Sequence, residues 1–103
     1  MGGDVELLRE VAEIFKNDGP AMLDAIRTQI AHQDAKGLER AAHALKGSVA
    51  NFGARGAFES ARALEMMGRE GNLAGAPETF DALERQIERL IFGLVEFTKP
   101  SPG

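Results

Sequence analysis

Residues 34–54 read DAKGLERAAHALKGSVANFGA, a stretch that predicts one amphipathic helix. Asp34 is a residue type favoured at a helix N-cap, and Gly53 is typical of the position where a helix ends. At 100° per residue, the apolar side chains between them fall within about 60° of one direction. They are Leu38, Ala41, Ala42, Leu45, Val49 and Phe52. We predict a helix from Asp34 to about Phe52 that buries this face.

The apolar spacing is helical almost throughout the chain, and no window shows the strict alternation of a half-buried strand. Four further helices are predicted, at about 4–16, 20–32, 54–69 and 77–97. In the first, Asp4 is the expected N-cap and the expected inward residues are Val5, Leu8, Val11 or Ala12, and Phe15. In the second they are Met22, Ile26 and Ile30. The last helix has the most regular stripe, formed by Phe80, Leu83, Ile87, Leu90, Ile91 and Leu94.

The segment Asn17-Asp18-Gly19-Pro20 separates the first two predicted helices. Proline is disfavoured inside a helix but suits the first turn of a new one, although the two could also form one bent unit. We therefore expect an all-α fold, an antiparallel four-helix bundle with an additional N-terminal helix. A chain of 103 residues is enough for one domain, with residues 1–3 and 99–103 as flexible ends.

Composition excludes several classes of function. The net charge of -4, without clustered Lys or Arg, argues against nucleic-acid binding. The chain has no cysteine, so it forms no disulfide or thiolate metal site, and its apolar runs are too short to span a membrane. No signal-peptide pattern is present. We expect a cytoplasmic protein, or the cytoplasmic part of a membrane-bound sensor.

His43 is the most informative residue of the helix over 34–52. It lies about 140° from Leu38 on the helical wheel, and Gly47 lies about 180° away, so the imidazole is predicted to be exposed. Gly47 is a full turn beyond it, and Ala50 and Ala54 continue along the same side. Glycine inside a helix costs about 0.5–1 kcal/mol relative to alanine. Small residues here favour a surface that a partner approaches.

The residue types around His43 suit a reversible phosphoryl carrier. A neutral imidazole is nucleophilic at physiological pH, and its attack on phosphorus gives a labile phosphoramidate. Lys46, about 80° from Leu38 on the wheel, is placed to interact with an anion on the imidazole. On the next predicted helix, Glu65 falls on the same apolar side as Phe58 and Ala61, where a carboxylate needs a partner.

The run from Ala42 to Ala54, AHALKGSVANFGA, closely resembles the signature of histidine-containing phosphotransfer (HPt) domains. That signature is usually written His-x-Leu-Lys-Gly-Ser-x-x-x-Phe/Leu/Ile-Gly-Ala. Gly37, Leu38 and the pair Leu64-Glu65 extend the resemblance in outline over nearly the whole chain. Val49 departs from the small residue that many members have there, and a core position tolerates this change.

The resemblance implies a role for each matching residue. His43 is the phosphoacceptor, Lys46 and Gly47 support it, and Glu65 can orient the imidazole. Ala50 and Ala54 are expected to belong to the docking surface because they extend the side of small residues beyond His43. The resemblance also implies a phosphoryl carrier without its own catalysis, in a two-component multistep phosphorelay. The partners are a response-regulator receiver domain, a hybrid histidine kinase, or both. No cofactor is expected on this chain, Mg²⁺ being supplied by the receiver, and a monomer fits the single exposed site.

Other functions remain open from the sequence. The same fold serves as the phosphoacceptor module of chemotaxis-type histidine kinases, and a structural or adaptor bundle is a third possibility. A dimerising kinase core would need a Pro-bearing signature after the histidine, which is missing. A metal bundle would need Glu-x-x-His pairs, which neither histidine has. His32 lacks the small neighbours of His43 and is interpreted as a surface residue near a helix C-terminus.

Overall fold

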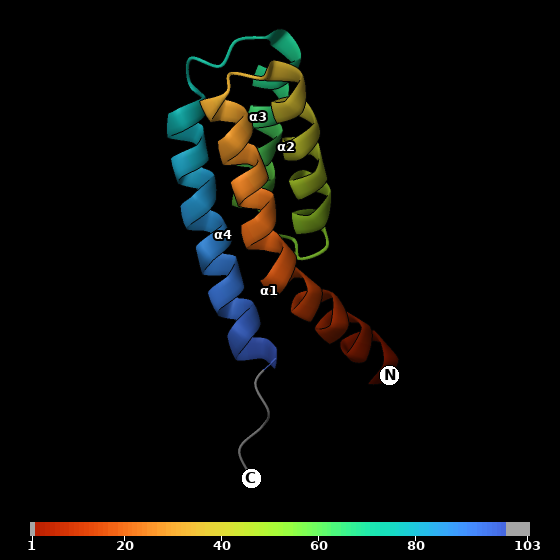
Figure 1. The fold of residues 1–103 in the computed structure, drawn as a ribbon. Helices are drawn as coiled ribbons and strands as arrows, with labels where there is room; N and C mark the ends of the chain where they lie inside the picture. The colour runs from red at the N-terminus through yellow and green to blue at the C-terminus, as the bar shows by residue number, and fades with distance from the viewer. Residues whose placement is uncertain (1, 99–103) are drawn as a thin grey trace.

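The computed structural model describes the backbone of residues 2–98 and the side chains of residues 5–98. Within this range it has four helices and no strand: α1 (Gly2–Ala31), α2 (Ala35–Ala50), α3 (Arg55–Glu70) and α4 (Ala76–Thr98). Consecutive helices run in opposite directions (Figure 1). Each packs against two neighbours in the ring α1–α2–α3–α4. The predicted antiparallel four-helix bundle is confirmed.

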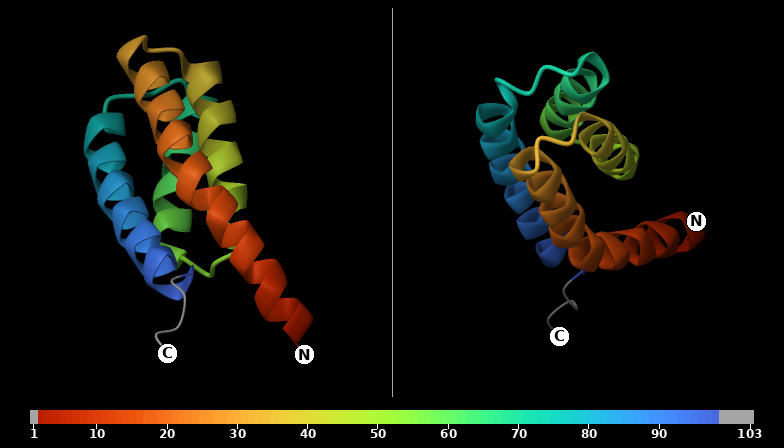
Figure 2. Two further views of the ribbon diagram at one scale, coloured as in Figure 1. Left: turned by 60° about the horizontal axis from the view of Figure 1, so that its bottom comes forward. Right: turned by 45° about the horizontal axis from the view of Figure 1, so that its top comes forward.

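The additional N-terminal helix is not a separate element, so this part of the prediction is wrong. α1 is continuous from Gly2 to Ala31 and contains Pro20. Proline removes one backbone hydrogen bond and costs about 3 kcal/mol inside a helix. Buried Phe15 and Leu23 lie on either side of it and pack in the same core, which offsets this cost. The helix bends instead of ending, and its first turns point away from the bundle (Figure 2).

The start of α1 also differs from the expectation. Because the helix begins at Gly2, Asp4 lies inside it and is not its N-cap, and the backbone of Gly2 and Gly3, part of the expected flexible N-terminus, is helical. The rest of the expected flexible ends, residue 1 and residues 99–103, lies outside the described residues.

The first turns of α1 extend beyond the core. Val5 and Leu8 were expected to face inward but are 50% and 39% exposed, whereas Ala12 and Phe15 are buried. The helical wheel places all four residues on one stripe. Their different exposure therefore depends on whether another helix packs against that part of the stripe. The bend directs the first turns away from the bundle (Figure 2). A contact of this region is Arg9, which lies over the ring of Phe97 near the end of α4.

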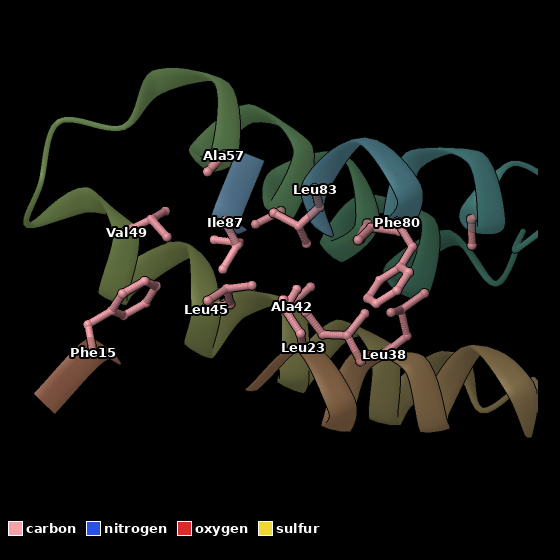
Figure 3. Close-up of a cluster of buried hydrophobic side chains, with 14 of the residues drawn as sticks. Phe15, Leu23, Leu38, Ala42, Leu45, Val49, Ala57, Phe80, Leu83 and Ile87 are labelled. Carbon is pink, nitrogen blue, oxygen red and sulfur yellow. The ribbon is translucent and has the colours of Figure 1, made fainter. Parts of the chain in front are cut away.

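The core of the bundle is formed by the stripes that the sequence predicts (Figure 3). α2 contributes Leu38, Ala42, Leu45 and Val49, all fully buried. α4 contributes Phe80, Leu83, Ile87 and Leu94. Leu90 and Ile91 are partly buried against the same cluster, as are Ala41 and Phe52. Among residues 2–98, none of the helices is long and apolar enough to cross a membrane.

The helix ends follow local rules. The Asp34 carboxylate accepts a hydrogen bond from the Gly37 amide at 2.9 Å, as its predicted N-cap role requires. α2 ends at Ala50, two residues before the predicted end, and Gly53 follows with φ +62°. α3 ends at Glu70, close to the predicted end at about residue 69, and Gly71 follows in the left-handed conformation.

α2 and α3 approach each other closely at Gly68. A Cβ atom there would lie 2.6 Å from the Ala35 carbonyl oxygen and 2.6 Å from the Glu39 amide nitrogen. Real side chains do not approach backbone atoms so closely, so only glycine allows this spacing. The close packing places the preceding turn of α3, which contains Glu65, opposite the middle of α2.

Candidate functional site

His43 projects from the middle of α2 and 67% of its side chain is exposed. The neighbouring positions 42 and 45 are fully buried, so the helix turns its apolar face inward and the imidazole outward. The predicted exposure of His43 is confirmed. Its placement on a rigid helix fixes the direction from which a second protein reaches the ring.

Glu65 of α3 contacts the imidazole directly. Its Oε2 atom lies 2.7 Å from Nδ1 of His43. A carboxylate only accepts hydrogen bonds, so this contact selects the tautomer in which Nδ1 holds the proton and donates. Nε2 then keeps its lone pair, as a nucleophile requires. The structure thus brings together the two residues that the sequence placed on separate helices.

Glu65 is a buried carboxylate surrounded by cationic groups. Its side chain is 5% exposed, and Oε1 lies 2.7 Å from the Lys46 ammonium. Oε2 also lies 3.4 Å from Nη2 of Arg69. The hydrogen bond from Lys46 lowers the pKa of Glu65 below its ordinary value, and the contact with His43 does so too, while burial raises it. The Glu65 carboxylate is therefore ionised at neutral pH.

We expect Glu65→Gln to lower the free energy of unfolding at pH 7 by about 1–3 kcal/mol, because Lys46 and His43 lose a charged acceptor. A lowered folded-state pKa stabilises the fold fully above about pH 4.3, the ordinary pKa of a glutamate, and the effect is lost as pH falls through the folded pKa. Urea unfolding at pH 7 and pH 3 measures this. A stability difference from the parent that is as large at pH 3 as at pH 7 would contradict it.

Lys46 is held by α3 more than by the histidine. Besides its ion pair with Glu65, its ammonium lies 5.9 Å from the centre of the Phe58 ring. Its side chain is 22% exposed. Lys46 and the imidazole of His43 therefore pair with the same carboxylate, that of Glu65.

Beyond His43 along α2, the surface is open and made of small residues. A Cβ added at Gly47 would meet nothing within 4 Å. Ala50 and Ala54 line a shallow hollow of about 580 Å³, together with Gly53, Arg55, Phe58 and Glu59. The predicted docking residues therefore lie beside one another, along the turn from α2 to α3.

Two residues of the site were missed by the sequence reasoning, Arg69 and Glu39. Nε of Arg69 lies 3.0 Å from Oε2 of Glu39. Both line a second open hollow with His43 and Glu65, completed by Lys36 and Arg40. The sequence does contain a pattern that points to them. Glu39 precedes His43 by four residues, and Arg69 follows Glu65 by four, so each pair lies on one helix face.

The other histidine is not part of this arrangement. His32 is exposed just after the end of α1, in the connection to α2. Among the described residues, no group of three or more His, Asp or Glu side chains could hold a metal ion. Glu65, the buried carboxylate at the site, already pairs with cations of this chain.

Comparison with known proteins gives two matches. The family described as the Hpt domain matches residues 10–92. The crystal structure of histidine-containing phosphotransfer protein B from Pseudomonas aeruginosa is similar, with a TM-score of 0.82 and 25% sequence identity. The match covers 85% of this chain and 76% of that one. Among curated proteins, no significant sequence match is found.

Proposed function

The chain belongs to the Hpt domain family and is a histidine phosphotransfer protein of the phosphorelay type, and from this premise we propose that His43 is its phosphoacceptor. The observation that supports this best is the 2.7 Å contact between Nδ1 of His43 and Glu65, on a side chain that is 67% exposed. It combines a nucleophilic nitrogen with access for a partner.

The proposed transfer needs no proton movement on this chain. Nε2 attacks the phosphorus of an aspartyl phosphate on the receiver, forming an N–P bond. The bond from phosphorus to the aspartyl oxygen breaks, and its electron pair stays on the released carboxylate. The ring keeps the proton on Nδ1 and becomes an imidazolium, which pairs with the Glu65 carboxylate. The reverse sequence donates the phosphoryl group to a second receiver.

Glu65 and Lys46 act by orientation and charge. A carboxylate that holds Nδ1–H fixes the ring and stabilises the positive charge that develops on it, as the aspartate of a catalytic triad does for its histidine. The Lys46 ammonium attracts the phosphoryl oxygens, since it pairs with the same carboxylate as the imidazole and its side chain is 22% exposed. Positioning and charge neutralisation account for most of the catalysis in phosphoryl transfer.

The remaining catalytic groups are proposed to come from the partner. Glu65 is engaged with Lys46 and Arg69, and such a site does not fit a bound cation. We therefore expect the receiver to supply Mg²⁺, and this chain to act as a carrier without autonomous catalysis. We further propose that the protein is a cytoplasmic monomer that exchanges with a receiver or a hybrid kinase, either as a free protein or as part of a longer one.

A phosphotransfer profile tests this function. Purified receiver domains of the source organism, loaded with labelled phosphate from acetyl phosphate, are each mixed with the protein. We expect fast transfer from a small number of receivers. If a chemotaxis-type catalytic domain labels the protein and no receiver does, the alternative kinase-module function applies. If neither labels it, the protein is a structural or adaptor bundle.

The open surface at Gly47 gives a direct test of docking. Gly47→Gln adds a long side chain where nothing lies within 4 Å, so the fold is kept while the partner's approach is obstructed. We expect the rate of transfer from the preferred receiver to fall by about tenfold or more, the effect of a contact worth about 1.4 kcal/mol.

The matched control for this test is Gly93→Gln. Gly93 is also a helical glycine with nothing within 4 Å, but it lies on α4. Thermal unfolding is expected to be similar for both variants, and only Gly47→Gln is expected to slow transfer. Equal rates for the two variants would remove Gly47 from the docking surface.

A further inference from the structure

Arg69 lies between two carboxylates at the edge of the phosphoacceptor site. Its Nε atom is 3.0 Å from Oε2 of Glu39, and its Nη2 atom is 3.4 Å from Oε2 of Glu65. That oxygen of Glu65 is the one that contacts Nδ1 of His43 at 2.7 Å. The guanidinium is therefore separated from the imidazole by a single shared oxygen atom.

The two contacts of Arg69 differ in strength. The contact with Glu39 has the distance of a good charge-assisted hydrogen bond, whereas 3.4 Å to Glu65 is at the long limit. Glu39 is the less exposed partner, at 22% against 55% for Arg69. Glu39 thus anchors the guanidinium, while 55% of the Arg69 side chain is exposed and accessible to a new anion.

Phosphorylation of His43 would introduce that anion. A phosphoryl group has a charge of about -1.5 to -2 and three acceptor oxygens, and guanidinium binds such groups through two parallel hydrogen bonds. Arg69 and His43 line the same hollow, which is open enough for a phosphoryl group. The phosphoryl group and the Glu39 carboxylate would then compete for one guanidinium.

We propose that Glu39 is a positioning residue for phosphoryl transfer, which acts by holding Arg69 and competing for it with the phosphoryl group on His43. The proposal rests on the function proposed above, because it assumes the same transfer between His43 and a receiver aspartate. As a consequence, phosphorylated His43 is less stable in the presence of Glu39 than it would be if Arg69 were free to bind the phosphoryl group. The phosphoryl group then remains easier to pass on.

A double-mutant cycle tests the proposal. Parent, Glu39→Gln, Arg69→Gln and the double variant are each equilibrated with a receiver that labels the parent. The ratio of label on this protein to label on the receiver is then measured. We expect Glu39→Gln to shift this ratio toward the phosphorylated histidine by about two- to fivefold, typical for a partly exposed ion pair. Arg69→Gln should shift it the other way.

The decisive comparison is made in the Arg69→Gln background. There Glu39→Gln should leave the ratio unchanged, because the guanidinium that Glu39 holds has been removed. A shift as large as that in the parent background would mean that Glu39 acts by its charge alone, and the proposal would be overturned. The proposal would also be overturned if Glu39→Gln, made alone in the parent protein, did not shift the ratio.

Two controls separate this proposal from its premises. Glu13→Gln removes a carboxylate from another exposed ion pair, with Lys16 on α1, and should leave the ratio unchanged. If it shifts the ratio as Glu39→Gln does, net charge explains the effect and the proposal fails. His43→Gln shows whether the proposed function holds. If His43→Gln takes up label, the proposed function fails as well. If His43→Gln takes up no label and none of the Glu39 and Arg69 variants shifts the ratio, only the role of Glu39 is overturned.

Discussion

We expect His43→Gln to abolish uptake of label from a phosphorylated receiver, while the folded structure is retained. The substitution removes the nitrogen nucleophile, and no side chain nearby replaces it, because Lys46 and Arg69 are protonated cations. An exposed side chain contributes little to packing, so circular dichroism and thermal unfolding should stay close to those of the parent. Gel electrophoresis of the labelled proteins measures the uptake directly.

The control for this prediction is His32→Gln. His32 is the other histidine of the chain and is also exposed, but it lies outside the site. It should leave uptake at the level of the parent. Label on His43→Gln equal to that on the parent would show that the acceptor is another residue, and loss of label in His32→Gln would point to that histidine instead.

Gly68→Ala produces the largest loss of stability expected from adding a single methyl group to this protein. The new Cβ atom would lie 2.6 Å from backbone atoms of both Ala35 and Glu39, so α2 and α3 must move apart. Overpacking of this kind costs about 1–3 kcal/mol. For a domain of this size, each kcal/mol lowers Tm by about 4–8 °C. Calorimetry or thermal unfolding followed by circular dichroism gives the value.

Gly93→Ala is the matched control for this second prediction. It adds the same methyl group to a helix interior where nothing lies within 4 Å. Alanine favours a helix over glycine by about 1 kcal/mol, so Tm should rise or stay the same. If Gly68→Ala proved as stable as Gly93→Ala, the close approach of α2 and α3 would not be a real constraint. Weaker transfer is also expected from Gly68→Ala, because Glu65 faces His43 across the same gap.

Much of the bundle follows from local patterns in the sequence. The stripes on α2 and α4 are observed where the spacing predicts them, and Asp34 is the N-cap that its residue type predicts. The error at Pro20 has a different origin. Helix propensity is a local quantity, whereas the continuity of α1 depends on Phe15 and Leu23 packing into one core from both sides of the proline. Tertiary packing outweighs a local cost of a few kcal/mol.

The candidate site also has features that one helix determines and features that depend on the packing of two helices. Exposure of His43 and the clearing at Gly47 follow from the geometry of a single helix, and so they were predicted from the wheel. That Glu65 contacts Nδ1 depends on the spacing of two helices, which Gly68 sets and the sequence pattern does not express. The contact between Arg69 and Glu39 crosses the same two helices, and for this reason helical periodicity alone did not find it.

The first turns of α1, which extend beyond the core, have a thermodynamic consequence. Val5 and Leu8 are largely exposed, and a helix without tertiary packing is only marginally stable in water. These first turns therefore form a segment of low local stability, which unfolds locally and independently of the cooperative unfolding of the bundle. The family match begins at residue 10, close to where burial begins at Val11 and Ala12. At the N-terminal side, the cooperative unit therefore begins close to where the family match begins.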